Sequence, residues 1–450
     1  MSPATDTIVA VATPSGRGAL GIIRLSGPQS GQIAQVMTGA APLPRVATLR
    51  DFRAADGTTL DRGLVLWFPA PHSYTGEDAI ELQGHGGPVV LDLLLRAACV
   101  LGARVARPGE FSERAFLNGR IDLVQAEAIA DLIDAASAEA ARAALCSLQG
   151  EFSRRVDVVV EALTQLRIYV EGALDFSDED IPWLQNVQLH RQLDEVIAQL
   201  QTLLAQAAQG RRLREGIVVT LTGQPNVGKS TLLNRLAGAE AAIVTEHAGT
   251  TRDVLRENIA IDGVPLTVVD TAGLRDSDDP IEREGVKRAW QALAQAEIAL
   301  FLVDDRVGLS DVDQALLQKL TPEIKVLIVS NKCDLSARAP SRDVRGLHPV
   351  IRLSAASGEG VELLTQEILL LAGMRTQGEG VFSARSRHLD ALRRALAAAK
   401  TARLRLTQIT AAELAAEELR LAQQALGEIT GEFSSDDLLG RVFSQFCIGK

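Results

Sequence analysis

The chain has 450 residues, and 46 Lys and Arg against 57 Asp and Glu give it a formal net charge of −11 at pH 7. At roughly 100 to 200 residues per domain, this length predicts two to four domains, each able to bury its own core. A hydrophobic share of 46% with 23% charged residues excludes a disordered or fibrous chain. The excess of acid argues against a protein that coats nucleic acid by general electrostatics.

Neither a membrane segment nor a targeting segment is expected. The uncharged apolar runs are all shorter than the roughly 18 residues that a membrane span needs. Residues 1–12 carry Asp6 and no basic residue, whereas a signal peptide begins with basic residues. We therefore expect a cytoplasmic protein that does not bind membranes. The cysteines form no C-x-x-C pair and are expected to be reduced thiols; they are Cys99, Cys146, Cys333 and Cys447.

In chain order, the sequence predicts α/β structure, then helix, then α/β structure, then helix again. Residues 1–119 alternate short β-branched runs with turn signals. Residues 120–215 are rich in Ala, Leu, Gln and Glu at helical spacing. Strands and helices alternate over 216–374, and the helical pattern returns over 375–450. Because insertion is tolerated where chain ends meet at a surface, we expect one discontinuous helical domain interrupted by an inserted α/β domain.

Residues 223–230, GQPNVGKS, match the phosphate-binding pattern G-x-x-x-x-G-K-[ST]. The apolar run 217–221 precedes the match and the helical segment 231–237 follows it, which is the context that a P-loop needs. In such a loop, backbone N–H groups and the helix N-terminus surround the phosphates. Lys229 then reaches the β and γ phosphates, and the Ser230 hydroxyl ligates Mg²⁺.

Two segments after the P-loop have the chemistry of GTPase switch regions. Residues 249–253, GTTRD, offer Thr251 as the switch threonine for Mg²⁺. Residues 268–273, VVDTAG, place Asp270 at the end of an apolar strand, where it can hold a magnesium-bound water, and end on a glycine whose N–H can meet the γ phosphate. Both segments therefore belong to the predicted nucleotide site.

Two later segments predict guanine recognition. Residues 331–334, NKCD, resemble the N-K-x-D motif, whose carboxylate accepts hydrogen bonds from guanine N1 and N2. Adenine does not offer these donors, so it would leave a buried charge unpaired. Residues 354–356, SAA, resemble the last base-contacting loop. Cys333 is then a variable motif position, and no redox role is expected for it.

The residue that orients the attacking water differs from the Ras pattern. Leu274 stands where Ras-like GTPases have Gln, and an aliphatic side chain cannot orient water. Glu282, in the acidic stretch 276–284, is a candidate for this role. On composition alone, a solvated acid at a helix start is the favoured interpretation of Glu282.

The motif set and several further blocks closely resemble the MnmE/TrmE family of tRNA-modification GTPases over essentially the whole chain. The GTPase motifs alone would not single out this family, whereas the terminal blocks do. These blocks are TPSGRG at 13–18, GED at 76–78, HGG at 85–87, PGEFSERA at 108–115 and CIGK at 447–450, together with GTTRD at 249–253.

The resemblance implies a multidomain protein with an N-terminal α/β folate-binding and dimerisation domain (1–119), a discontinuous helical domain (120–215 and 375–450) and an inserted Ras-like P-loop G domain (216–374). It implies a homodimer that hydrolyses GTP with Mg²⁺ and is stimulated by K⁺. With an FAD-dependent MnmG-type partner, in a heterotetramer or larger complex, relatives add a carboxymethylaminomethyl group at C5 of the wobble uridine of certain tRNAs. The one-carbon donor is a tetrahydrofolate, either the 5-formyl or the 5,10-methylene derivative.

The resemblance also assigns site residues by motif position. K⁺ would be held by Asn226, Thr245, His247 and Thr250, beside the β and γ phosphates where it supplies positive charge. Glu282 matches the water-orienting acid of the family, which raises it above the solvated alternative. The GTP-contacting positions are Asn226, Val227, Gly228, Lys229, Ser230, Thr231, Thr245, Glu246, His247, Ala248, Gly249, Thr250, Thr251, Asp270, Thr271, Ala272, Gly273, Asn331, Lys332, Asp334, Ser354, Ala355 and Ala356.

The N-terminal region matches the dinucleotide pattern G-x-G-x-x-G at 16–21, but residues 21–25 are short and β-branched and predict a strand rather than the helix that a Rossmann site requires. We therefore reject NAD binding. The resemblance assigns folate contacts to Arg24, Glu81, Arg120 and Lys450, although relatives can carry Lys where Arg120 stands, which changes the contact geometry. It places Cys447 beside the folate, where covalent catalysis and a packing role are about equally supported.

Contact with tRNA has a weaker signal. Residues 385–405 hold seven basic residues against Asp390 on a predicted helix. A solvated helix face balanced by nearby glutamates is the more common explanation of such a run. Delegation of most tRNA binding to the partner fits the net charge better. The alternative for the whole protein is a GTPase switch in ribosome assembly or scaffolding, without folate chemistry.

Overall fold

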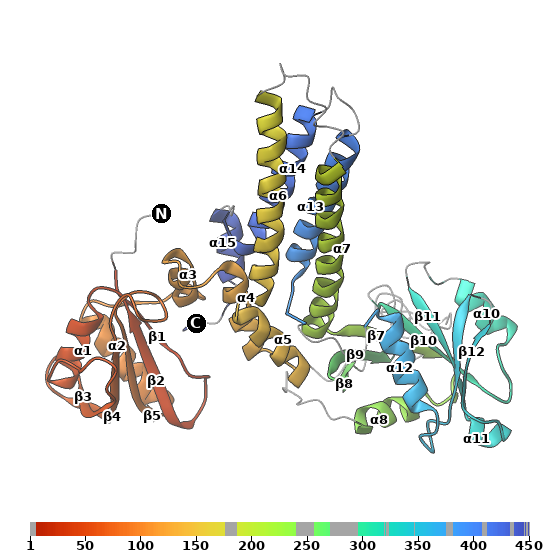
Figure 1. The fold of residues 1–450 in the computed structure, drawn as a ribbon. Helices are drawn as coiled ribbons and strands as arrows, with labels where there is room; N and C mark the ends of the chain where they lie inside the picture. The colour runs from red at the N-terminus through yellow and green to blue at the C-terminus, as the bar shows by residue number, and fades with distance from the viewer. Residues whose placement is uncertain are drawn as a thin grey trace, which may run out of the picture. The chain divides into compact units, whose positions relative to one another are not determined.

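The computed structural model describes residues 6–175, 187–239, 256–270, 296–318, 320, 324–345, 347–374, 381–406, 412–432, 436–444, 446 and 449 (Figure 1). The chain folds into two compact units. The first contains Met1–Ala130, Ser153–Trp183 and Arg405–Lys450, and the second contains Asp131–Phe152 and Leu184–Leu404. The predicted domain boundaries after residues 119, 215 and 374 stay a prediction, because a compact unit can hold more than one domain.

The first unit begins with a six-stranded mixed sheet in the order β3-β4-β5-β2-β1-β6. The predicted strand at 21–25 is confirmed, since it lies within β2 and pairs with β1 and β5. The G-x-G-x-x-G match therefore enters a strand and not a nucleotide-binding helix. The strands are β1 (Ile8–Val11), β2 (Gly18–Ser26), β3 (Thr48–Arg53), β4 (Thr59–Phe68), β5 (Ala79–Gly86) and β6 (Arg104–Val105).

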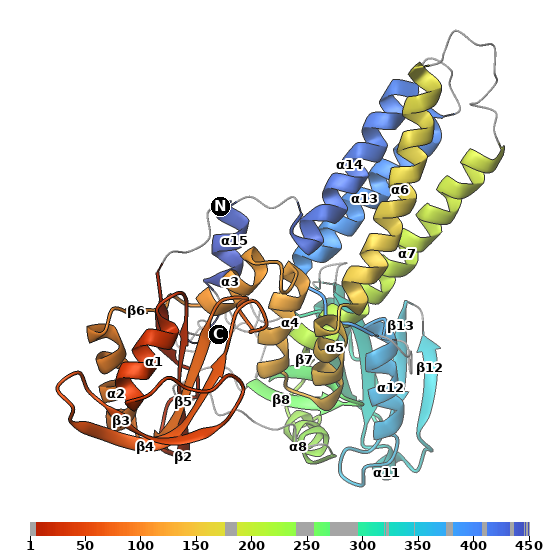
Figure 2. The ribbon, with the colours of Figure 1, turned by 60° about the vertical axis from the view of Figure 1, so that its left-hand side comes forward.

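Two helices, α1 (Ser30–Thr38) and α2 (Pro88–Val100), share one core with this sheet (Figure 2). Ile33 of α1 and Leu94 of α2 are buried there with Ile23 and Leu82 of the strands. The other described helices of the unit are α3 (Glu110–Leu117), α4 (Leu123–Ile133), which runs across the boundary between the units, α6 (Glu151–Asp175), α14 (Ala412–Thr430) and α15 (Asp436–Phe443).

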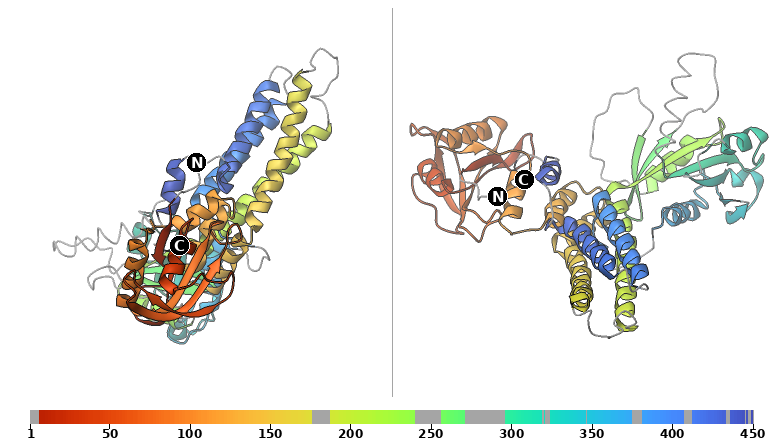
Figure 3. Two further views of the ribbon diagram at one scale, coloured as in Figure 1. Left: turned by 90° about the vertical axis from the view of Figure 1, so that its left-hand side faces the viewer. Right: turned by 90° about the horizontal axis from the view of Figure 1, so that it is seen from above.

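The C-terminal part of the chain returns to the N-terminal part within this unit. Helix α15 lies beside α3 (Figure 3). Gly109, at φ 68°, precedes α3, and a Cβ there would lie 2.5 Å from the carbonyl oxygen of Phe443. A Cβ on Gly449 would lie 2.3 Å from the carbonyl oxygen of Val11 in β1. Glycine at both positions therefore permits close backbone contact between the two ends of the chain.

The second unit contains a seven-stranded sheet in the order β12-β13-β11-β10-β7-β9-β8. The five strands β13, β11, β10, β7 and β9 are parallel, and the two edge strands are antiparallel to their neighbours. The strands are β7 (Ile217–Gly223), β8 (Arg256–Ile261), β9 (Val264–Asp270), β10 (Ile298–Asp304), β11 (Lys325–Asn331), β12 (Ser341–Arg345) and β13 (His348–Arg352).

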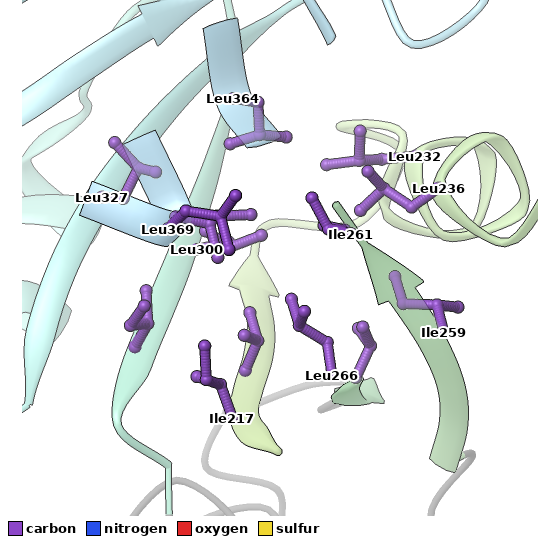
Figure 4. Packing of buried hydrophobic residues seen from close by; sticks show 14 of the residues in the cluster. Ile217, Leu232, Leu236, Ile259, Ile261, Leu266, Leu300, Leu327, Leu364 and Leu369 are labelled. Carbon is purple, nitrogen blue, oxygen red and sulfur yellow. The ribbon is translucent and has the colours of Figure 1, made fainter. Parts of the chain in front are cut away.

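Helices cover both faces of this sheet, which explains why the central strands β10 and β11 are almost continuously apolar. Leu232 and Leu236 of α8 and Leu364 of α12 pack on one face (Figure 4), and Leu316 of α10 packs with Phe301 on the other. The helices of the unit within the described residues are α5 (Ala138–Leu148), α7 (Val187–Glu215), α8 (Lys229–Ala239), α10 (Asp311–Gln318), α11 (Cys333–Ser336), α12 (Val361–Leu371) and α13 (Ser386–Arg405).

The chain enters and leaves this α/β region through one cluster of contacts. Arg214, near the end of α7, and Arg385, just before α13, each place a guanidinium nitrogen 2.7 Å from Oδ1 of Asp131. The ring of Phe382 stacks on that of Phe152, with centroids 4.2 Å apart. An α/β fold interrupting helices confirms the predicted fold class. Among the described helices, none has the length and apolarity needed to cross a membrane.

Candidate functional site

The predicted P-loop connects β7 to α8 and has the backbone of a phosphate-binding turn. Gly223, Asn226 and Gly228 have φ of 135°, 64° and 99°. A Cβ at Gly223 would lie 2.3 Å from the carbonyl oxygen of Leu302, and one at Gly228 would lie 2.3 Å from Nδ2 of Asn331. Both glycines are therefore required by packing as well as by φ.

Lys229, the first residue of α8, folds back over this loop. Its Nζ donates hydrogen bonds to the carbonyl oxygens of Gly223 (2.9 Å) and Gln224 (3.0 Å). Ser230 and Thr231 follow on the exposed start of the helix. The positive ammonium, the helix N-terminus and the hydroxyls thus lie together, which is the arrangement that binds phosphate with a magnesium ion.

Asn331, at the end of β11, connects three motifs: the P-loop (223–230), the N-K-x-D segment (331–334) and the base-contacting loop (354–356), called the base loop below. Its side chain is buried, its Nδ2 donates to the carbonyl oxygen of Val227 (2.8 Å), and its Oδ1 accepts from the Ala355 N–H (2.9 Å). Lys332 follows in a left-handed conformation with φ of 68°. Its Nζ donates to the carbonyl oxygen of Asn226 and to Oδ2 of Asp304 (3.1 Å). The P-loop, the N-K-x-D segment and the base loop therefore meet at the carboxyl ends of parallel strands.

Two aspartates at the end of β10 support the N-K-x-D segment, and the sequence reasoning did not single them out. Hydrogen bonds from Arg306 and Lys332 hold the pKa of Asp304 well below its ordinary value. Burial raises the pKa of Asp305, but hydrogen bonds from Ser336, Ser330 and Arg352 outweigh that effect and keep the carboxyl ionised. The sequence signal that points to them is the pair of adjacent aspartates at the end of a buried strand that lies beside the P-loop strand.

The remaining residues of these motifs differ in exposure. Asp334 is exposed, so its carboxylate is accessible to a base. Cys333 is buried, and burial together with the charge of Asp334 raises the pKa of its thiol, which agrees with the absence of a redox role. Ser354 is buried, and its Oγ accepts a hydrogen bond from the Ser357 N–H at 3.2 Å.

Part of the predicted site falls outside the described residues. Asp270 ends β9, and its backbone pairs with Leu221 of β7, two residues before Gly223, but its side chain is outside the description. The other predicted site residues outside the described residues keep their roles as predictions; they are Thr245, Glu246, His247, Ala248, Gly249, Thr250, Thr251, Thr271, Ala272, Gly273, Glu282, Cys447 and Lys450.

The first unit brings two of the predicted folate residues together. Arg24 of β2 and Glu81 of β5 are register partners, and the Arg24 guanidinium lies 2.9 Å from Oε1 of Glu81. The Arg24 guanidinium also lies 6.0 Å from the centroid of the Phe111 ring. Arg120 packs beside the GED block, since a Cβ on Gly76 would lie 3.2 Å from its Cγ.

Three of the basic residues in 385–405 pair with acids of the same unit. Arg385 pairs with Asp131, Arg394 pairs with Asp390 at 3.0 Å, and Arg403 pairs with Asp194 at 2.9 Å. These ion pairs favour the solvated and balanced helix over a phosphate-binding face.

A P-loop and a guanine motif on a seven-stranded, mainly parallel sheet define a GTPase of the G-domain class. A family model of the MnmE helical domain matches residues 123–447, and a model described as the GTP-binding protein TrmE N-terminus matches residues 7–120. The chain belongs to the MnmE/TrmE family.

Solved structures with similarity to part of the chain include Era proteins and a FeoB G domain. Era from Aquifex aeolicus bound to GDP and AlF4⁻ is 25% identical, with 40% of this chain and 66% of that chain covered and a TM-score of 0.29. Era in complex with MgGDPNP and nucleotides 1506–1542 of 16S ribosomal RNA is 26% identical, with the same coverages and a TM-score of 0.28. The G domain of the T. maritima FeoB iron transporter is 23% identical, with coverages of 35% and 98% and a TM-score of 0.27. The match thus spans just under two thirds of the Era chains.

Proposed function

We propose that this protein is a K⁺-stimulated GTP hydrolase that modifies the wobble uridine of certain tRNAs. Together with an FAD-dependent partner, it would add a carboxymethylaminomethyl group at C5, using a one-carbon unit from a tetrahydrofolate. The observation that carries the GTPase part is Asn331, whose buried amide joins the phosphate loop to the base loop. Family membership supports the tRNA part.

The residues at the P-loop fit GTP with Mg²⁺. Lys229 and the N-terminus of α8 supply positive charge to the phosphates, and the exposed Ser230 hydroxyl is a hard oxygen ligand of the kind that Mg²⁺ takes. Mg²⁺ would neutralise charge on the β and γ phosphates during hydrolysis. We place Glu282 as the residue that orients the attacking water. Its replacement by Ala should lower turnover and leave GTP affinity similar.

K⁺ would bind beside Asn226, together with groups of Thr245, His247 and Thr250. Asn226 lies on the P-loop with φ of 64°, and its carbonyl oxygen is already held by Lys332. The Asn226 residue is exposed, so its side-chain amide oxygen is available as a further ligand. A monovalent cation there supplies the charge that an arginine finger supplies in other GTPases.

The folate would bind near Arg24 and Glu81, where a cation and a carboxylate offer hydrogen bonds to a pterin and its glutamate tail. Gly449 packs on Val11 of β1, and the neighbouring Ala10 is the register partner of Arg24. This contact brings the C-terminal segment toward Arg24 and supports assigning Lys450 and Cys447 to the same site. Arg120 completes the proposed set.

We further propose a cytoplasmic homodimer that joins an MnmG-type partner in a heterotetramer or larger complex. Leu49 of β3 and Leu64 of β4 are register partners and are 54% and 38% exposed. Paired exposed leucines on a sheet face support contact with a second copy of the N-terminal region.

Analysis of wobble nucleosides tests the function directly. A strain that lacks this protein should lose the C5 modification, and the wild-type gene should restore it, whereas the Lys229→Ala variant should not. A strain that keeps full modification without the protein would contradict the tRNA role and favour a switch in ribosome assembly.

Equilibrium binding of 5-formyltetrahydrofolate tests the folate site separately. The wild-type dimer should bind it, and Arg24→Ala should weaken binding because a charged contact and the Glu81 partner are lost together. Arg96→Ala is the matched control, since Arg96 forms an exposed ion pair with Asp92 on α2. Absence of binding to the wild type would overturn the folate assignment.

A further inference from the structure

Arg235 of α8 holds the base loop from the side of the P-loop helix. Its Nε donates a hydrogen bond to the carbonyl oxygen of Ala355 at 3.2 Å, and its Nη2 donates to the carbonyl oxygen of Ala356. Leu232 and Leu236 of the same helix are buried in the core (Figure 4). Because these leucines fix the position of α8, the backbone of Arg235 is fixed relative to the loop that its guanidinium holds.

The other groups of the base loop are used within the site. The Ala355 N–H donates to Asn331, and the Ser357 N–H donates to Oγ of Ser354. The Gly358 N–H donates to the carbonyl oxygen of Ser354 at 2.9 Å. Within the described part of the chain, the N–H of Ala356 has no acceptor, and Ala356 is exposed. This N–H is the donor that the loop leaves for a ligand.

The carbonyl of Ala355 and the N–H of Ala356 belong to one planar trans peptide, so they point in opposite directions. A side chain that fixes the carbonyl therefore fixes the direction of the N–H. Arg235 holds this carbonyl and the next one, and its planar guanidinium is suited to two acceptors at once. Without it, the peptide between Ala355 and Ala356 could rotate in solvent.

We propose that Arg235 is a positioning residue for base selection, which presents the Ala356 N–H to the nucleotide base. This inference rests on the proposed guanine-nucleotide binding. At position 6, guanine carries an acceptor oxygen whereas adenine carries an amino donor. A fixed N–H group can donate a hydrogen bond to the guanine oxygen, whereas it opposes the amino donor of adenine. Asp334 serves the other edge of the base, where guanine carries N1 and the 2-amino group.

Two other nucleotides distinguish the role of Arg235 from that of Asp334. Inosine diphosphate (IDP) keeps O6 and lacks the 2-amino group, whereas ADP lacks O6. We expect Arg235→Ala in the full chain to weaken GDP and IDP by the same factor, about tenfold for one charge-assisted hydrogen bond, with little change for ADP. Asp334→Asn should instead lower the ratio of GDP to IDP affinity. Arg235→Lys should be intermediate, because an ammonium holds one carbonyl less rigidly.

Competition against a fluorescent GDP analogue measures these affinities, and the thermal midpoint monitors folding. Arg342→Ala is the matched control, since Arg342 pairs with Glu367 in the same α/β region and is not part of the nucleotide site. It should leave GDP affinity unchanged. Unchanged GDP affinity in Arg235→Ala, or equal losses for GDP and ADP, would overturn the inference. A wild type that does not prefer GDP to ADP would instead contradict the proposed function itself.

Discussion

Asn331 shows how much one buried amide can organise. Its side-chain amide donates a hydrogen bond to the carbonyl oxygen of Val227 and accepts one from the Ala355 N–H, so two loops that are separate in sequence share one residue. In the sequence it is one letter of a guanine motif. In the structure its position also forbids a side chain at residue 228, where a Cβ would meet its Nδ2.

We predict that Asn331→Ala both destabilises the nucleotide site and weakens GTP binding. The change leaves a buried carbonyl and a buried N–H without partners, at a cost of about 1–3 kcal/mol for each group. Thermal unfolding and GTP titration measure the two effects. Asn258→Ala is the control, because Asn258 accepts an exposed hydrogen bond from Thr267. Equal effects of both changes would show that Asn331 has no special role.

At the scale of elements, ion pairs between distant segments hold α3 and the inserted region in place. Arg114 of α3 is buried and pairs with Glu77, Glu110 and Asp6. Asp131 receives arginines that lie 83 and 254 residues away in sequence. Buried ion pairs of this kind favour one arrangement of the chain only when each buried charge has a partner of opposite sign.

Glu110 should make the N-terminal region sensitive to acid. Burial raises its pKa, but hydrogen bonds from Arg104, the Arg107 N–H and Arg114 outweigh this and lower it from 4.5 to about 2. The folded-state pKa is depressed, so the stabilisation is complete above pH 4.5 and is lost as the pH falls toward 2. It amounts to about 2 kcal/mol once the half-exposed Arg104 is allowed for.

Unfolding between pH 3 and 6, followed by Trp67 fluorescence in a variant without the other tryptophans, measures this dependence. Glu110→Gln should remove most of the slope. Glu417→Gln, which breaks an exposed pair with Arg420 on α14, should leave the slope intact. A slope that survives in Glu110→Gln would assign the acid sensitivity to another carboxyl group.

Replacement of Asp131 should loosen the point where the chain enters and leaves the inserted region. Asp131→Ala removes the buried carboxylate with which both Arg214 and Arg385 pair, and we expect a loss of about 2–4 kcal/mol. Limited proteolysis near residues 381–386 and the thermal midpoint report it. Asp194→Ala removes the exposed partner of Arg403 and should change neither. Equal protection of both variants would contradict a structural role for Asp131.

For the whole molecule, the acidic balance and the paired arginines Arg394 and Arg403 of α13 weigh against binding of nucleic acid by general electrostatics. The net charge of −11 gives no general attraction for a polyanion. GTP turnover, in contrast, should respond strongly to one specific cation.

We predict that GTP turnover in K⁺ exceeds that in Na⁺ by roughly tenfold or more, because the proposed ion would supply the positive charge that an arginine finger supplies in other GTPases. Asn226→Ala should bring the ratio close to one, while Asn234→Ala, an exposed position on α8, should keep it. Phosphate release at constant ionic strength is the measurement. Equal rates of the wild type in the two salts would remove Asn226 from the ligand set.

Local sequence patterns were enough to predict the class of the protein, the interruption of helices by an α/β region, and the strand that excludes a Rossmann site. These features depend on short-range constraints, such as glycines at positive φ and apolar runs of fixed period, and such constraints are written locally. The resemblance in the terminal blocks added the family.

Tertiary structure alone decided which distant residues meet. Arg235 reaches a loop 120 residues away, Asp131 joins two arginines, and Gly449 packs on β1 beside the strand of Arg24. These contacts depend on the order of strands in each sheet and on the helices that cover it. The hydrophobic period of a single sequence predicts each strand but not the order of strands in the sheet. Likewise, an exposed arginine on a helix looks the same in the sequence whether or not a loop lies against it.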